Sequence, residues 1–244
     1  MSETARIWIE VSFDIIYLIV VWILVIAMYR HRSIVKIENQ RVAKLTMIAF
    51  ILLALGDTGH VGFRVVAYAM GETAPQVSFL GMEFGLRGIG TLSTAITVTL
   101  FYVLILAIWR SRFNKKYGPF QHLLFAAALI RLVMLALPVN QWDSPVPPQP
   151  WSIIRNLPLL IQGLGVTYLI LRDARTNKDR TFSWIGIMIL FSYACYMIVI
   201  LFVQQIPLIG MLMMPKTMAY IAIGLLAYNA LYRASPAWPE TIKS

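Results

Sequence analysis

Charged and titratable side chains interrupt several segments of this chain that are otherwise apolar enough to cross a membrane. An ion at membrane depth costs a few kcal/mol or more unless it is paired or hydrated, so such residues are candidates for a functional role. The sequence predicts a site built from two sets of them. The candidate acid and base are Asp57 and His60, and the candidate ligand-binding residues are Arg64, Glu83, Arg87, Arg131, Arg155, Asn156 and Lys216.

Asp57, His60 and Arg64 follow the spacing i, i+3, i+7, which places them on one face of a helix. A carboxylate one helical turn from an imidazole can fix its tautomer and raise its basicity, as a general base requires. In the structural alternative, Asp57 and Arg64 form an ion pair between helices and His60 completes a hydrogen-bond network. We predict functional roles for Asp57 and His60, and both interpretations of Arg64 stay open.

Three further arginines are placed where they can recognise an anion. Arg131 lies near the middle of its apolar segment, so it must find an anion or a polar cavity inside the protein. Arg155 and Asn156 precede Pro158, which removes a helical hydrogen bond and leaves a carbonyl free beside them. Together with Arg87, these planar guanidinium groups suit a carboxylate or a phosphate.

Lys216 follows a proline in the last apolar segment. A lysine removed from water can act as a nucleophile, a base or a proton carrier. Alternatively, Lys216 forms a buried ion pair with a carboxylate such as Asp57 or Glu83. The sequence favours neither role.

The composition is that of an integral membrane protein. Of the 244 residues, 59% are hydrophobic and 13% are charged, and the mean hydropathy is +0.72; an ordinary soluble domain has about 25% charged residues. Most lysines and arginines behind the net charge of +10 lie in short loops between apolar segments. The charge therefore reports membrane topology, and we expect membrane lipids rather than nucleic acid as partners.

Seven apolar segments are long enough to be membrane helices, and they predict an all-α fold. Basic residues fill the first, third and fifth connections, whereas the alternate connections 71–82, 139–150 and 204–207 contain no lysine or arginine. This alternation predicts an external N-terminus and a cytoplasmic C-terminus, in the plasma (inner) membrane. The single membrane domain 1–244 has predicted helices at 7–28, 45–70, 84–109, 120–137, 151–171, 184–203 and 208–232.

Several metal and cofactor sites cannot be assembled from this sequence. The chain contains three histidines, and two of them, His31 and His122, lie at the predicted cytoplasmic side. A zinc site built from several histidines and a haem held by two histidines are therefore excluded. The single cysteine, Cys195, permits no internal disulfide. We expect neither a metal nor a cofactor.

A lysine in the last of seven helices, with an external N-terminus, resembles the arrangement in microbial rhodopsins. The resemblance implies a retinal Schiff base on Lys216 and a supporting arginine at Arg87. The sequence departs from that family at Gly90, where a carboxylate counter-ion is wanted, and at Tyr193 and Tyr196, where the retinal pocket usually has tryptophans. Retinal binding is the least favoured alternative.

On the predicted topology, the buried charges lie between the membrane midplane and the outer surface, and the cytoplasmic half is almost purely apolar. We expect an outward-side polar pocket with a small excess of cations, which binds a small anionic ligand or a lipid headgroup for transport or sensing. The alternative is an enzyme acting on an outer-leaflet lipid, with Asp57 and His60 as acid and base. The sequence does not decide whether the protein is an enzyme.

Overall fold

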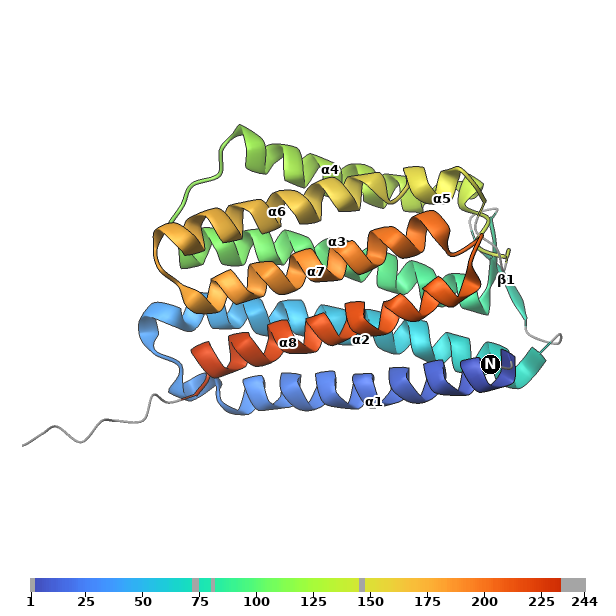
Figure 1. Cartoon of the computed structure of the whole chain (residues 1–244), viewed down its shortest axis with the longest axis horizontal. Helices are drawn as coiled ribbons and strands as arrows, with labels where there is room; N and C mark the ends of the chain where they lie inside the picture. Colours follow the sequence, from blue (N-terminus) through green and yellow to red (C-terminus); the bar gives the residue numbers. More distant parts are fainter. Residues whose placement is uncertain (1–2, 72–74, 80–81, 145–147, 234–244) are drawn as a thin grey trace, which may run out of the picture.

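Long helices that run side by side along one axis form almost the whole structure (Figure 1). The computed structural model describes residues 3–71, 75–79, 82–144 and 148–233, and it is 83% helical, which confirms the all-α class. The helices are α1 (Glu3–Arg30), α2 (Gln40–Met70), α3 (Leu86–Arg112), α4 (Pro119–Leu135), α5 (Trp151–Ile154), α6 (Leu157–Thr176), α7 (Arg180–Phe202) and α8 (Met213–Leu231).

Each of the seven predicted segments contains a helix, and six of them are long and apolar enough to cross a membrane. The exception is α4, which has 17 residues. At 1.5 Å per residue it spans about 25 Å, somewhat less than the roughly 30 Å hydrocarbon core of a bilayer. These six apolar helices indicate an integral membrane protein.

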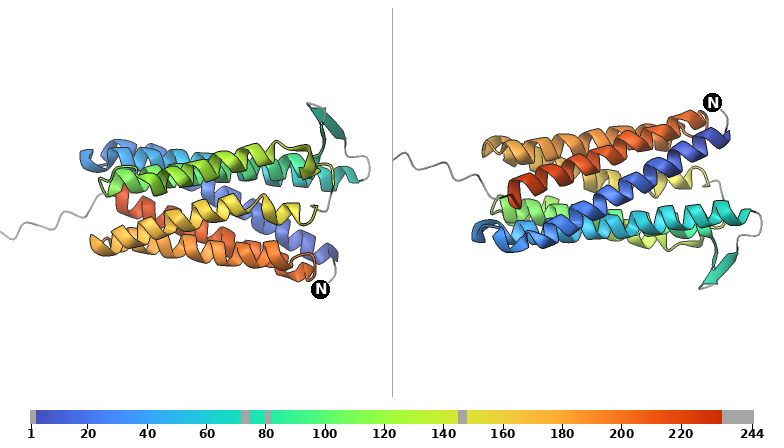
Figure 2. Two further views of the ribbon diagram at one scale, coloured as in Figure 1. Left: turned by 90° about the horizontal axis from the view of Figure 1, so that it is seen from above. Right: turned by 90° about the horizontal axis from the view of Figure 1, so that it is seen from below.

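The connections separate into two kinds at opposite ends of the bundle (Figures 1 and 2). The basic loops that join α1 to α2, α3 to α4 and α6 to α7 gather at one end, which we call the basic end. The start of α1, the short helix α5 and the connection between α7 and α8 lie at the other, which we call the N-terminal end. Because successive helices run in opposite directions, successive connections lie at opposite ends of the bundle, and the basic connections share one end.

Two of the predicted helices are not continuous α-helices, and in both cases a proline lies in the first turn of the α-helix that follows the irregularity. The predicted helix at 151–171 is broken between α5 and α6, so that Pro158 falls in the first turn of α6, where its missing N–H costs nothing. The last predicted helix starts with a 3-10 helix, Pro207–Leu212, and α8 begins at Met213, which places Pro215 in its first turn. Arg155 and Lys216 therefore lie at helix ends rather than inside continuous helices.

A small antiparallel hairpin replaces part of the connection predicted between the second and third helices. Strand β1 (Gln76–Phe79) pairs with β2 (Met82–Gly85) from Gln76 opposite Gly85 to Phe79 opposite Met82. The Gly85 amide donates a 3.2 Å hydrogen bond to the carbonyl of Trp142, which joins the hairpin to the connection after α4. This hairpin contains Glu83.

Large apolar side chains fill the half of the bundle toward the basic end. Those that are almost completely buried include Met28, Phe50, Phe101, Tyr102 and Trp109. The polar residues of the candidate site lie in the other half, toward the N-terminal end.

Candidate functional site

A cavity of about 660 Å³ opens among the helices in the half toward the N-terminal end. A ligand pocket typically has a volume of roughly 300–1,000 Å³. The cavity brings together eight of the nine residues predicted for the site, namely Asp57, His60, Arg64, Arg87, Arg131, Arg155, Asn156 and Lys216. Glu83 is not among its lining residues and is exposed on β2.

Asp57 is held by two hydroxyl groups from neighbouring helices. Tyr17 on α1 donates a hydrogen bond of 2.7 Å to Oδ2, and Thr94 on α3 donates one of 2.9 Å to Oδ1. Both donors are neutral, so they satisfy the carboxylate oxygens without neutralising the charge. No basic side chain in the described part of the chain forms an ion pair with Asp57.

His60 faces the cavity one turn from Asp57, but the two side chains are not joined by a hydrogen bond. Its Nδ1 atom is buried and has no hydrogen-bond partner among the residues described. The carboxylate therefore does not orient the imidazole in this conformation. The role of Asp57 and His60 as an acid and base stays a prediction.

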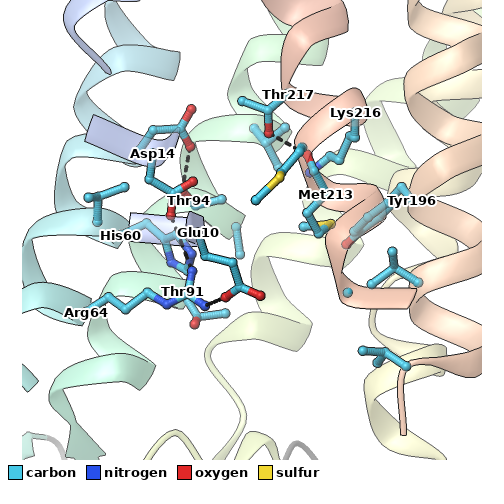
Figure 3. Close-up of a pocket in the computed structure, with 18 of the residues that line it drawn as sticks. Glu10, Asp14, His60, Arg64, Thr91, Thr94, Tyr196, Met213, Lys216 and Thr217 are labelled. Atoms are coloured by element: carbon cyan, nitrogen blue, oxygen red, sulfur yellow. Dashed lines mark hydrogen bonds and ion pairs between the residues drawn. The ribbon is translucent and has the colours of Figure 1, made fainter. Parts of the chain in front are cut away.

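Arg64 connects α2 to α1 at the edge of the cavity. Its Nη2 atom lies 2.8 Å from Oε2 of Glu10, and its Nη1 atom lies 3.3 Å from Oδ2 of Asp14. One of the two alternatives from the sequence made Asp57 and Arg64 partners in an ion pair between helices; the structure pairs Arg64 with the two carboxylates of α1 instead (Figure 3). The rotation of α1 about its own axis decides which carboxylates face Arg64. The spacing of residues within α2 carries no information about that rotation.

Arg131 is 2% exposed, and its guanidinium group is incompletely hydrogen-bonded in the described structure. Its Nη2 atom donates a long hydrogen bond of 3.3 Å to Oδ1 of Asn156, while Nε and Nη1 have no partner in the described structure. The sequence places Arg131 near the middle of its apolar segment, but the structure does not place it near the middle of α4. Because α4 ends at Leu135, Arg131 lies about one turn from the helix end.

Arg155 is held by Asn140, a residue whose role the sequence did not reveal. Arg155 is 7% exposed, donates a 3.1 Å hydrogen bond to Oδ1 of Asn140, and lies 4.6 Å from the ring of Trp142. The Asn140 amide also donates to the carbonyl of Met134, over 2.7 Å, near the end of α4. The one signal in the sequence is an asparagine shortly after an apolar helix, because its side-chain amide can donate to the last carbonyl groups of that helix.

Lys216 and Arg87 contact aromatic rings rather than carboxylates. The Lys216 ammonium lies 4.7 Å from the ring centre of Tyr196, and Arg87 lies 4.7 Å from that of Tyr68. The predicted alternative of an ion pair between Lys216 and Asp57 or Glu83 is absent from the structure described. Contact with a ring face stabilises a cation partially and leaves room for an anion.

Apart from Arg64 and Arg87, the charges of the cavity are separated across it. Three carboxylates, those of Glu10, Asp14 and Asp57, come from α1 and α2, whereas Arg131, Arg155 and Lys216 come from α4, the α5–α6 break and α8. Figure 3 shows Glu10 and Asp14 on one side and Lys216 with Tyr196 on the other. Such an arrangement can bind an anion at the second group of helices.

The known proteins give no guide to this site. No protein family, curated protein or solved structure matches the chain. Among the residues that the structure describes, no group of three or more His, Cys, Asp and Glu side chains is arranged to hold a metal ion. The interpretation of the site therefore depends on its own geometry.

Proposed function

We propose that this protein resides in the plasma (inner) membrane, with its N-terminus outside and its C-terminus in the cytoplasm. We further propose that its cavity binds a small anionic ligand or a lipid headgroup from the outer side, for transport or sensing. The supporting observation is the buried Arg131 guanidinium, which has two donors without partners and lines the cavity.

Burying an unpaired charge of this kind costs free energy unless a ligand or water forms hydrogen bonds with it. A buried ion that lacks its partner costs about 3–5 kcal/mol. Arg155 and Lys216 add two cations that also lack an ion-pair partner among the described side chains. An anion that enters between these three groups gains attraction from all of them and completes the free donors of Arg131.

The apolar core toward the basic end favours sensing, or binding from one side, over transport. A transporter needs polar groups along a path to the second surface, whereas Phe50, Phe101 and Tyr102 pack tightly beneath the cavity. Transport would require these aromatic side chains to move apart. The enzymatic alternative, with Asp57 and His60 acting on an outer-leaflet lipid, lacks the hydrogen bond that would couple them.

Anion binding can be measured by the thermal stability of the purified protein in detergent. Sodium phosphate should raise the melting temperature more than tetramethylammonium chloride of equal ionic strength, because a bound ligand at 100 times its Kd stabilises by about 2.7 kcal/mol. Arg131→Gln should remove this stabilisation. Arg175→Gln, which changes an exposed arginine at the basic end, should retain it.

Arg131→Lys provides a second variant that keeps the charge but loses the planar fork. It should fold and bind phosphate more weakly than the unchanged protein. If phosphate does not stabilise the protein, or if Arg131→Gln and Arg175→Gln respond alike, the proposed anion site is wrong.

A further inference from the structure

The carboxylates of the cavity do not fit a ligand that is only an anion. Asp57 is fixed by Tyr17 and Thr94 so that its charge faces the same space as Arg131, Arg155 and Lys216. A simple anion in that space would be repelled by Asp57. A ligand that carries a positive group as well would turn this repulsion into attraction.

Internal neutralisation does not explain Asp57. Glu10 and Asp14 are both bound to Arg64, so their charges are partly compensated by protein. Asp57 and Lys216 both line the cavity, but they do not form an ion pair in the described structure, and the Lys216 ammonium lies against Tyr196 instead. The charge of Asp57 is thus left for something that enters the cavity.

Resting on the proposed function, we infer that the ligand is an amino-phosphate, with its phosphate held by Arg131, Arg155 and Lys216 and its ammonium group by Asp57. The three cations are more than a single carboxylate group on the ligand could neutralise. A phosphate monoester carries a charge of about −1.5 to −2 and so neutralises more of them. The fork of a guanidinium also matches phosphate oxygens. An ammonium group offers three donors to the carboxylate oxygens at the opposite side.

Free phosphoethanolamine is a phosphate monoester of this kind. The headgroup of phosphatidylethanolamine carries the same ammonium group on a phosphodiester, which has a single negative charge and leaves more of the cationic charge uncompensated. A lipid headgroup would enter from the outer leaflet, while the free compound would enter from water. The geometry of the cavity accommodates the polar part of either, since its volume is about 660 Å³. The two sources differ in whether an acyl chain is needed for binding.

The test compares phosphoethanolamine with ethyl phosphate, which lacks the ammonium group, by calorimetric titration of the detergent-solubilised protein. Phosphoethanolamine should bind at least about tenfold more tightly, because a close charge pair in a desolvated site contributes about 1.5 kcal/mol or more. Asp57→Asn should remove that preference and leave the affinity for ethyl phosphate unchanged or higher. Asp57→Glu, which keeps the charge, should retain part of the preference, and Glu38→Gln on an exposed loop should retain all of it.

The outcomes separate this inference from the anion site on which it depends. Equal binding of the two phosphates, with no effect of Asp57→Asn, would overturn the amino-phosphate ligand while the anion site stands. Binding of neither phosphate in detergent, together with equal stability in nanodiscs of phosphatidylethanolamine and phosphatidylglycerol, would overturn both. Greater stability in phosphatidylethanolamine, lost in Asp57→Asn, would support the inference and identify the lipid as the source.

Discussion

Trp109 on α3 donates a hydrogen bond of 2.8 Å to Asp173 on α6, at the basic end of the bundle and away from the cavity. Trp109 is 1% exposed and Asp173 is 4% exposed. Arg172 and Lys115 also approach Asp173, at 2.9 and 3.6 Å. This hydrogen bond joins α3 to α6 at the end of the bundle opposite the candidate site.

Replacing Asp173 should therefore reduce stability without changing the ligand site. Asp173→Ala leaves the buried indole N–H without an acceptor, which should cost about 1–3 kcal/mol of unfolding free energy. Asp173→Asn keeps an acceptor oxygen and loses the partly exposed ion pairs, so its cost should be about 1 kcal/mol or less. Denaturation in detergent measures both. Equal losses in the two variants would show that the ion pairs, not the indole hydrogen bond, stabilise this end.

The hydroxyl groups of Tyr17 and Thr94 should make interdependent contributions because they bind the same carboxylate. Tyr17→Phe and Thr94→Val each remove one donor to Asp57, with an expected loss of about 1.5–3 kcal/mol, the range for hydrogen bonds to charged groups. The double variant should lose more than the sum, because the carboxylate then has no donor. Tyr228→Phe removes a hydroxyl bound to exposed His31 and is the matched control. Strict additivity would contradict this account of Asp57.

Much of the fold and the membership of the site could be predicted from the sequence, because both depend on properties of single segments. The apolar runs decided the helices, and the cost of burying a charge singled out Asp57, Arg131, Arg155 and Lys216. Seven apolar segments with alternating loop charge thus account for the bundle. That part required no knowledge of how the helices face one another.

The contacts within the site could not be predicted, because they depend on the rotation and crossing of helices far apart in the sequence. Tyr17 is 40 residues from Asp57, and nothing in its local sequence relates the two. Trp109 is 64 residues from Asp173, and nothing local to either residue relates them. The acceptor on α6 lets the indole be buried, because its N–H then has a hydrogen-bond partner.

Close contact between α2 and α3 depends on glycine at position 56. A Cβ atom there would lie 1.7 Å from Oγ1 and 2.7 Å from Cβ of Thr97. Gly56→Ala must therefore push the two helices apart, with an expected cost of about 1–3 kcal/mol. Gly62 on the same helix has no atom within 4 Å of such a Cβ, so Gly62→Ala should be neutral or stabilise the helix by up to about 1 kcal/mol.

The thermal stabilities of these two alanine variants check the packing directly. Adding Thr97→Ala to Gly56→Ala removes the closer of the two clashing atoms and should restore part of the stability. Similar melting temperatures for Gly56→Ala and Gly62→Ala would contradict the contact between α2 and α3.

The proposed orientation in the membrane can be tested with two matched serine-to-cysteine variants. Ser33 is exposed in the connection between α1 and α2, beside Arg32 and Lys36, and Ser144 lies in the connection after α4, which has no lysine or arginine. Because positively charged loops stay in the cytoplasm, Ser144→Cys should react with a membrane-impermeant thiol reagent in intact cells. Ser33→Cys should react only after the membrane is permeabilised. The native Cys195 is buried, so the unchanged protein provides the background. Labelling of Ser33→Cys in intact cells, with protection of Ser144→Cys, would place the cavity on the cytoplasmic side, and every ligand proposed here would have to come from the cytoplasm or the inner leaflet.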